Sequence, residues 1–277
     1  MARDYDAAAP PAARIAIEVV NRMEPGAARP YRLEMTTLSP SVSEVAGPVA
    51  DTDWRAVEDH LRERPYATLP GRLSSETCAS LAALWSEAGA FRSHVDMGRH
   101  RFGIGAYRYF AHPLPSLVDT LRRQCYAPLA VIANRWMESL GSSERFPAAF
   151  EEFEDRCARA GQRRPTPLLL RYEAGGYNCL HQDVYGAVAF PMQVVVFLGR
   201  PGVDFEGGEF LLVQQRPRAQ SVAEVVPGAQ GEMVVFANRY WPATGARGFH
   251  RTNVRHGVSR LRAGTRFALG IIFHDAA

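Results

Sequence analysis

A histidine and an aspartate stand two positions apart at His181 and Asp183. Where such a pair lies at the end of a β-strand, both side chains point to the same face, because side chains alternate along a strand. An imidazole and a carboxylate on one face are suitable ligands for a divalent metal ion. The same spacing occurs a second time, at His94 and Asp96, so the spacing alone does not identify a site.

The residues around the two pairs lead to different predictions. Residues 168–172 predict a buried strand, a Gly-Gly turn follows, and a second apolar strand then leads into His181. No apolar strand leads into His94, which stands in a stretch rich in arginine and glycine. We therefore interpret His181 and Asp183 as the metal ligands.

A third ligand is available later in the chain. His256 precedes a glycine-containing turn, and the apolar run over residues 265–273 predicts a buried strand that begins near Arg266. A turn of this length would return the chain antiparallel and bring Arg266 close to His256. Two histidines and one aspartate, with three positions left open, are the ligand set of non-haem Fe(II) oxygenases. A buried arginine beside them can bind a carboxylate through two charge-assisted hydrogen bonds.

His250 is an alternative third ligand, because Arg260 also follows it by ten residues. However, residues 261–264 predict a turn rather than a strand, and we therefore favour His256. The remaining histidines are expected on the surface or in the core rather than at a metal: His60, His100, His112 and His274.

In the order HxD, HxV and GxRxxL, these motifs resemble the Fe(II)/2-oxoglutarate-dependent dioxygenase superfamily. Residues 171–183 are similar to the AlkB-type nucleic-acid dealkylases. Residues 206–236 and the ten-residue spacing from His256 to Arg266 are similar to the prolyl-hydroxylase branch, whereas AlkB-type enzymes place the arginine farther along. Residues 165–275 also resemble an uncharacterised bacterial oxygenase family that has been predicted to act on damaged nucleic acid.

The resemblance implies a double-stranded β-helix with the metal at its mouth. It also implies Fe(II) as cofactor, and 2-oxoglutarate and O2 as co-substrates. His181, Asp183 and His256 would bind the iron and form the catalytic centre, and Arg266 would pair with the distal carboxylate of 2-oxoglutarate. In such enzymes 2-oxoglutarate is converted to succinate and CO2, and a C–H bond of the substrate is hydroxylated. Hydroxylation of an N-methyl group is followed by loss of formaldehyde.

Further contacts with 2-oxoglutarate are implied by the same resemblance. Tyr172 matches a tyrosine that hydrogen-bonds the co-substrate. Phe197 stands where prolyl hydroxylases often carry another tyrosine for this purpose, so one hydrogen bond is lost. Thr265 and Gln193 are candidates to replace it.

The substrate is predicted from charge and aromatic content. All 32 basic residues are arginine, and the formal net charge is +3. Residues 233–274 contain seven arginines and no acidic residue, which favours an anionic substrate and supports nucleic acid. If the substrate is nucleic acid, we expect this segment to face the barrel mouth. Tyr107, Tyr109 and Tyr185 are candidates to stack on a flipped base. A protein side chain or a small molecule, hydroxylated by the same chemistry, is the alternative substrate.

The order of predicted elements indicates an α+β protein, with a helical N-terminal part packed on a jelly-roll core. Helical patterns cover residues 51–64, a segment from residue 74, and residues 116–140 and 144–160, with a short strand at 66–69 and a loop or hairpin at 94–110. Short apolar runs between glycine-containing turns predict strands at residues 168–172, 193–198, 209–213, 232–237 and 265–273.

We divide the chain into three expected parts. Residues 1–50, rich in Ala, Pro and Ser, are expected to form a weakly ordered arm with one helix at residues 12–23. Residues 51–164 are expected to form a mainly helical support region. Residues 165–277 are expected to form the double-stranded β-helix catalytic core.

Cysteine usage and hydropathy bear on location. The four cysteines, Cys78, Cys125, Cys157 and Cys179, are far apart and form no CxxC pair. This argues against a disulfide framework and is typical of a reducing compartment. Because no run of 18 apolar residues occurs, we expect a cytoplasmic protein without a membrane partner.

Two other functions account for part of the sequence. A non-enzymatic, cupin-type binding module would explain the strands and the basic surface, but not the ordered combination of His181, Asp183, His256 and Arg266. A jelly roll that uses another metal for hydrolysis or isomerisation would leave Arg266 without a role. Titration of the pure protein with iron and 2-oxoglutarate distinguishes these functions.

Overall fold

The computed structural model describes residues 49–216, 219–246 and 248–277, which belong to one compact unit. The arm predicted over residues 1–50 lies almost entirely outside these ranges, and its helix at residues 12–23 lies wholly outside them. Helices and two antiparallel sheets make up the described part, as expected for an α+β protein. No helix in the described ranges has the length and apolar character needed to cross a membrane.

The helices are α1 (Trp54–Glu63), α2 (Ser75–Ala83), α3 (Met97–His100), α4 (Ser116–Ser139) and α5 (Phe150–Arg159), with 3-10 turns at Val49–Asp51, Leu84–Ser86 and Ala88–Ala90. The larger sheet contains β1 (Tyr66–Leu69), β2 (Phe91–Asp96), β4 (Ala106–Phe110), β5 (Leu168–Glu173), β7 (Met192–Phe197), β8 (Phe205–Gly207), β11 (Met233–Ala237) and β14 (Leu261–Ile271). The smaller sheet contains β3 (Gly103–Ile104), β6 (Tyr177–His181), β9 (Phe210–Gln215), β10 (Val222–Val226), β12 (Tyr240–Gly245) and β13 (Gly248–Val258).

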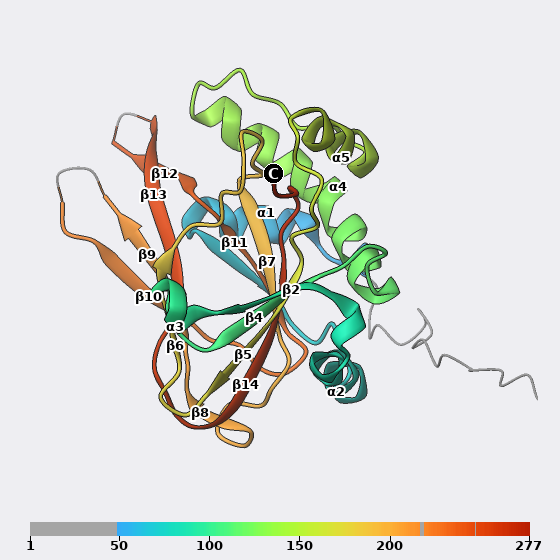
Figure 1. Cartoon of the computed structure of the whole chain (residues 1–277). Coiled ribbons are helices and arrows are strands. Elements are labelled where there is room, and N and C mark those ends of the chain that lie inside the picture. The colour runs from blue at the N-terminus through green and yellow to red at the C-terminus, as the bar shows by residue number, and fades with distance from the viewer. Residues whose placement is uncertain (1–48, 217–218, 247) are drawn as a thin grey trace, which may run out of the picture. The chain divides into compact units, whose positions relative to one another are not determined.

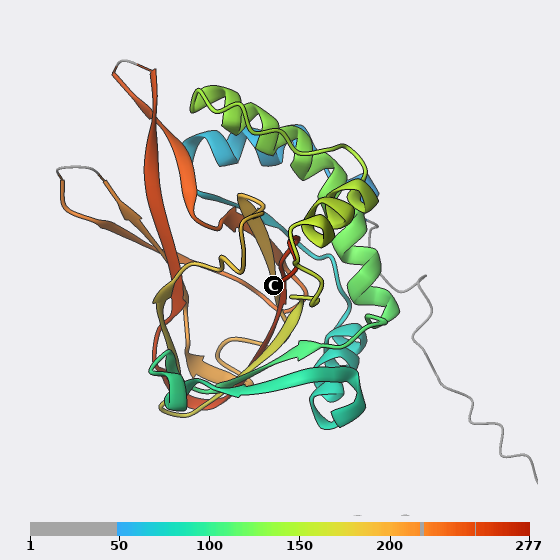
Figure 2. The same cartoon turned by 45° about the horizontal axis from the view of Figure 1, so that its top comes forward.

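The two sheets face each other, and α1, α2, α4 and α5 lie on the outer side of the larger sheet (Figures 1 and 2). The larger sheet has the order β1-β11-β7-β14-β5-β4-β2, with β8 beside β14. The smaller sheet has the order β10-β9-β13-β6-β3, with β12 beside β13. Consecutive strands β13 and β14 therefore belong to different sheets, and the turn between them crosses from one sheet to the other.

Burial along the strands reflects this arrangement. Every residue of β7 and of β11 is buried, because one face lines the interior between the sheets and the other is covered by helices. Along β9, buried residues alternate with half-buried ones. This alternation is expected of an antiparallel sheet with one face open to solvent, and it places the interior of the molecule between the two sheets.

Several predicted elements begin where local chemistry favours them. Asp53 caps α1, with its carboxylate accepting from two backbone N–H groups at 3.1 Å, and Ser74 caps α2. The helix predicted over residues 144–160 instead begins at Phe150. The side chain of Asn134 hydrogen-bonds the backbone N–H and the carbonyl oxygen of Phe146 at 2.8 and 2.9 Å. Phe146 also precedes a proline, and proline disfavours the helical conformation in the residue before it.

The region predicted as helical support also contributes strands. Strand β1 pairs with β11, and β4 pairs with β5, so residues 66–69 and 106–110 extend the larger sheet. The hairpin expected over residues 94–110 is present as β2 and β4, with α3 and β3 between them. Sheet pairing therefore crosses residue 164, where we expected the support region to end and the core to begin.

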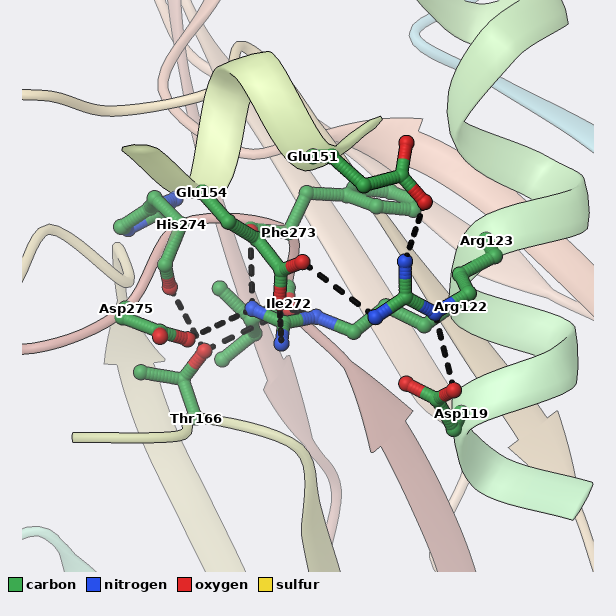
Figure 3. Close-up of polar contacts among 10 residues, drawn as sticks. All are labelled: Asp119, Arg122, Arg123, Glu151, Glu154, Thr166, Ile272, Phe273, His274 and Asp275. Atoms are coloured by element: carbon green, nitrogen blue, oxygen red, sulfur yellow. Dashed lines mark hydrogen bonds and ion pairs between the residues drawn. The ribbon is translucent and has the colours of Figure 1, made fainter. Parts of the chain in front are cut away.

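A buried arginine joins α4 to the segment after β14 (Figure 3). Arg122 is fully buried, and its Nε donates to the carbonyl oxygen of Ile272 at 3.0 Å. Its Nη2 donates to the carbonyl oxygen of Phe273 at 2.8 Å and to Oδ1 of Asp275 at 2.7 Å. These bonds satisfy the backbone where the last long strand ends, and they attach the helical layer to the sheet.

Candidate metal centre

The three predicted ligands meet where β6 and β13 pair. His181 ends β6, and in the strand register it lies opposite His256 of β13. Asp183 follows two residues after His181, and one ligand atom from each of the three lies within 4.8 Å of the others. Nε2 of His256 is 3.2 Å from Oδ2 of Asp183, and Nε2 of His181 is 3.6 Å from Oδ1.

Hydrogen bonding and burial prepare both imidazoles to bind a metal. Nδ1 of His181 lies 2.8 Å from the carbonyl oxygen of Cys179, so this nitrogen carries the proton and Nε2 is left with its lone pair. His256 is buried, and its burial, together with the neighbouring imidazole of His181, lowers its pKa. The neutral imidazole is the form that binds metal. Two such imidazoles and one carboxylate, on one side of a cavity, fit Fe(II).

The carboxylate of Asp183 is held from both sides. The hydroxyl of Tyr185 donates to its Oδ1 at 2.6 Å, and Nε2 of Gln193 donates to its Oδ2 at 3.0 Å. Burial favours the protonated acid, but the neighbouring His181 and His256 and the hydrogen bond from Tyr185 outweigh burial and hold the pKa of Asp183 below its usual range. Asp183 is therefore an ionised candidate ligand with a defined orientation.

The backbone of Asp183 is also anchored. Asn238, which is buried after the end of β11, accepts from the Asp183 N–H at 3.0 Å and donates to its carbonyl oxygen at 2.5 Å. No pattern in the sequence singles out this asparagine, because it acts on a residue 55 positions away.

Arg266 enters the same cavity from the facing sheet. It is 2% exposed, and rings of Tyr172, Phe197 and Phe205 lie 5.6 to 5.9 Å from its guanidinium carbon. Within the described ranges its side chain forms no hydrogen bond and no ion pair within 4.0 Å. Burial lowers its pKa, but an arginine starting from 12.5 remains charged at neutral pH. Arg266 thus presents an unpaired positive charge to the cavity.

Tyr172 stands opposite Arg266 in the register of β5 and β14. It is fully buried, its hydroxyl accepts from Nδ2 of Asn178 at 3.3 Å, and burial raises its pKa to about 12. It is therefore a neutral phenol with a proton to donate. Gly105 makes room for the ring, because a Cβ at this position would lie 2.8 Å from Cδ1 of Tyr172.

The two candidate replacements for the lost tyrosine are placed differently. Gln193 is buried and lines the cavity, with Nε2 3.2 Å from Nε2 of His256, so it lies at the metal end rather than beside Arg266. Thr265 does not line the cavity, because it precedes Arg266 on β14 and alternate side chains point to opposite faces. Phe197 does not line the cavity but packs near Arg266.

The three tyrosines considered for base stacking lie close together around Asp183. Tyr107 and Tyr185 line the cavity, whereas Tyr109 does not. The hydroxyl of Tyr109 donates to that of Tyr185 at 3.0 Å, and Tyr185 donates in turn to Asp183. Tyr109 and Tyr185 therefore support the ligand, and their hydroxyls are occupied within the protein.

The cavity between the sheets has a volume of about 390 Å³. Its walls include Arg101, Phe102 and Leu180, which sequence reasoning did not single out. His94, Asp96 and His250 do not line it.

The expectation for the acid-free segment, residues 233–274, is wrong. This segment runs through β11 to β14 and so through both sheets, and of its described arginines only Arg266 lines the cavity. Arg239 and Arg251 instead lie 4.7 and 4.8 Å from the ring of Tyr240, and Arg260 lies 4.5 Å from that of Tyr177. Strands that alternate between two sheets cannot present their charges on one surface.

Comparison with known proteins agrees with this geometry. A family model described as "Oxygenase, catalysing oxidative methylation of damaged DNA" matches residues 105–276. Uncharacterised proteins from two strains of Mycobacterium tuberculosis, CDC 1551 and H37Rv, are each 43% identical to this chain over 182 residues. That match covers 64% of this chain and 78% of theirs.

Among solved structures, a prolyl-4-hydroxylase from Pseudomonas putida is similar, with a TM-score of 0.50 and 16% sequence identity. The similarity covers 81% of this chain and 100% of that one. At this identity the similarity concerns the fold, and it confirms the expected double-stranded β-helix.

Proposed function

The chain belongs to the oxygenase family whose model it matches, and we propose that it is an Fe(II)- and 2-oxoglutarate-dependent dioxygenase that oxidises an alkylated nucleobase. The expected superfamily and the expected enzyme class are confirmed by the family match and by the fold. The substrate and the roles of individual residues are our proposal.

Arg266 is the observation that carries the co-substrate assignment. An isolated buried charge costs several kcal/mol unless a partner of opposite charge compensates it. No described residue supplies that partner, and the guanidinium faces the cavity that also contains the candidate metal ligands. A dicarboxylate such as 2-oxoglutarate can place one carboxylate on Arg266 while its 2-keto acid end reaches the metal. A binding module or a hydrolase has no such need for both groups.

The ligand set would hold Fe(II) through Nε2 of His181, Nε2 of His256 and the carboxylate of Asp183. When bound, iron supplies the activation of O2 that couples oxidation of 2-oxoglutarate to hydroxylation of the substrate. The protein holds the carboxylate of Asp183 through Tyr185 and Gln193, which restricts how that ligand can turn.

The other end of the co-substrate would be bound by Arg266 and Tyr172. Arg266 offers two parallel N–H donors to a carboxylate, and the neutral hydroxyl of Tyr172 adds a third donor. The surrounding rings of Phe197 and Phe205 exclude water and so strengthen the pairing of charges.

A nucleobase substrate is supported by the description of the family and by the arginine-only basic composition. Oxidation of an N-methyl group gives a hydroxymethyl group that is lost as formaldehyde, so the reaction proposed removes methylation rather than adding it. A cavity of about 390 Å³ is at the small end of ligand sites, which favours one base or one side chain as the inserted group.

Succinate formation tests the proposal when the pure protein is supplied with Fe(II), 2-oxoglutarate and one member of a panel. The panel contains N-methylated oligonucleotides, peptides and small metabolites. We expect turnover that depends on both Fe(II) and 2-oxoglutarate and that releases formaldehyde with a methylated oligonucleotide. Turnover with a peptide alone would contradict the substrate, and an absence of 2-oxoglutarate binding would contradict the chemistry.

A further inference from the structure

Two residues after the end of α3, Arg101 and Phe102, line the cavity and are exposed. Arg101 is exposed, and its guanidinium forms no hydrogen bond and no ion pair with the described residues, although Arg99 nearby pairs with Asp96 at 3.8 Å. Phe102 is 47% exposed and lines the cavity. Both therefore present free chemical groups beside the candidate metal centre.

The fold holds these residues against the strand that carries His181. The N–H of Cys179 donates to the carbonyl oxygen of Phe102 at 2.8 Å, and Gly103 pairs with Asn178 of β6. Gly103 allows this close approach, because a Cβ there would lie 2.2 Å from a backbone oxygen of β6. Figure 1 shows α3 beside β6 at the edge of the smaller sheet. Arg101 and Phe102 together are called the rim below. The pairing of strands in the smaller sheet thus fixes the position of the rim relative to the candidate ligands.

The backbone of Arg101 is unusual. It adopts φ 60° and ψ 28° after the last residue of α3, and among the described residues it is the only non-glycine with a positive φ. Glycine or asparagine normally fills such a helix end. An arginine at this position is not explained by local conformation, and its side chain contributes nothing to the described packing.

The exposed groups have the chemistry of nucleotide recognition. The ring of Phe102 stacks on the ring of His100, with centroids 5.4 Å apart and planes 20° apart, and the residue is still 47% exposed. Leu180, 40% exposed, also lines the mouth. An aromatic face binds any base by stacking, and a guanidinium binds a phosphate through two hydrogen bonds.

The tyrosines first considered for stacking are less suited to it. Tyr109 and Tyr185 are engaged with each other and with Asp183, deep beside the ligands. Phe102 has no polar group to satisfy and lies at the mouth, where a neighbouring nucleotide would pass.

We propose that Arg101 and Phe102 form the substrate-recognition element of this site, with Phe102 stacking on a base and Arg101 binding an adjacent phosphate of a nucleic acid strand. The proposal rests on the proposed function, since it assumes a nucleic acid substrate. It assigns the specificity to the rim, and leaves Arg266 to 2-oxoglutarate.

The test measures binding of a fluorescein-labelled single-stranded oligonucleotide with one N-methylated adenine, in the presence of Mn(II) and 2-oxoglutarate. The variants are Arg101→Ala and Phe102→Ala, each with a matched control. Arg99→Ala removes an arginine two residues away whose side chain is 84% exposed, and Phe249→Ala removes a phenylalanine of equal exposure, 47%, that does not line the cavity.

We expect Phe102→Ala to weaken binding by about 5- to 150-fold, and Arg101→Ala to weaken it and to reduce the salt slope by about one. The two controls should bind as the unchanged protein does. Affinity for 2-oxoglutarate and the melting temperature should stay unchanged in both rim variants. Arg101→Gly, which suits the positive φ, should melt at the same or a higher temperature and still bind weakly.

The possible failures are distinguishable. If the unchanged protein binds the oligonucleotide and the rim variants bind equally well, the rim assignment is wrong while the proposed function stands. If the unchanged protein binds and oxidises a peptide but no oligonucleotide, the nucleic acid substrate is wrong and the rim assignment falls with it. A lower melting temperature in Arg101→Gly would indicate a structural role for Arg101 instead.

Discussion

Each of the three candidate ligands contributes one donor atom, and among the described residues the cluster of possible ligands consists of these three side chains. We therefore predict that His181→Ala, Asp183→Ala and His256→Ala each abolish Fe(II)-dependent turnover and weaken Mn(II) binding by at least about 100-fold. Circular dichroism should show the fold retained. His250→Ala, six residues away on β13, is the control and should keep full activity. The opposite result, loss of activity in His250→Ala and not in His256→Ala, would show that His250 and not His256 is the third ligand.

Arg266 is expected to act on the co-substrate and not on the metal. Loss of a charge-assisted bidentate pair should cost about 2–4 kcal/mol, so Arg266→Ala should bind 2-oxoglutarate about 30- to 1000-fold more weakly. Arg266→Lys should also bind 2-oxoglutarate more weakly, because an ammonium cannot form the two parallel hydrogen bonds of a guanidinium with a carboxylate. Calorimetric titration of the Mn(II)-loaded protein with 2-oxoglutarate measures the affinity of both variants. Mn(II) affinity should change little, and Arg260→Ala, an exposed neighbour on the chain, should behave as the unchanged protein. Unaltered 2-oxoglutarate binding in Arg266→Ala would refute the assignment.

At the scale of elements, the buried side chain of Arg122 provides hydrogen bonds that attach α4 to the segment after β14. Arg122→Ala would leave the carboxylate of Asp275 and two backbone carbonyls without their donor in a buried region. We predict a loss of about 3–5 kcal/mol in the free energy of unfolding, measured by urea denaturation. The neighbouring Arg123 offers the control. It makes ion pairs with Asp119 and Glu151, but it is 38% exposed, so Arg123→Ala should cost less than about 1 kcal/mol (Figure 3). Equal losses of unfolding free energy in the two variants would contradict the stabilising role of the buried Arg122.

The segment after β14 also predicts how stability depends on pH. His274 is fully buried, its Nδ1 accepts from the Phe190 N–H at 3.2 Å, and burial lowers its pKa from 6.5 to about 4. The unfolded chain takes up this proton first, so stability should fall as the pH drops from 6.5 towards 4 and should level off below that. The difference between the two pKa values corresponds to about 3 kcal/mol.

The variant His274→Asn tests this dependence, because the amide oxygen of asparagine can accept from the Phe190 N–H and does not titrate. Chelator-treated protein should be used, so that loss of metal does not contribute. The variant should lose less stability than the unchanged protein between pH 7 and pH 5. His60→Asn, at an exposed position of α1, is the control and should leave the dependence as it was. An unchanged dependence in His274→Asn would exclude His274 as the cause.

For the whole molecule, charge governs how a nucleic acid strand would be bound. With arginine as the only basic residue type and a net charge of +3, binding should rest on phosphate contacts. We predict that the affinity for a single-stranded oligonucleotide falls by about one power of salt concentration for each phosphate neutralised. Fluorescence anisotropy between low and moderate salt measures the slope. If the affinity for the oligonucleotide does not depend on salt, phosphate contacts do not carry the binding, and this would argue for a neutral substrate. An absence of binding at low salt would exclude nucleic acid.

Local patterns in the chain were enough to predict much of this molecule. Short apolar runs separated by turns predicted strands such as β5 and β7, because alternation and burial are properties of neighbouring residues. Capping residues predicted where α1 and α2 begin, since a cap acts over two or three positions. The spacing of His181, Asp183 and His256 predicted which side chains the fold brings together, and Arg266 was correctly placed in the same cavity.

Contacts between distant residues decided the rest. A short turn after β13 favoured a hairpin in which β14 would pair with β13. Instead β14 pairs with β5 and β7, so Arg266 faces His256 from the opposite sheet rather than from a neighbouring strand of the same sheet. The anchoring of Asp183 by Asn238 and the unpaired rim at Arg101 have no local signal. Sequence spacing records which residues are neighbours along the chain. Which backbone groups find partners across two sheets, and which side chains are left without one, depends on the packing of the whole fold.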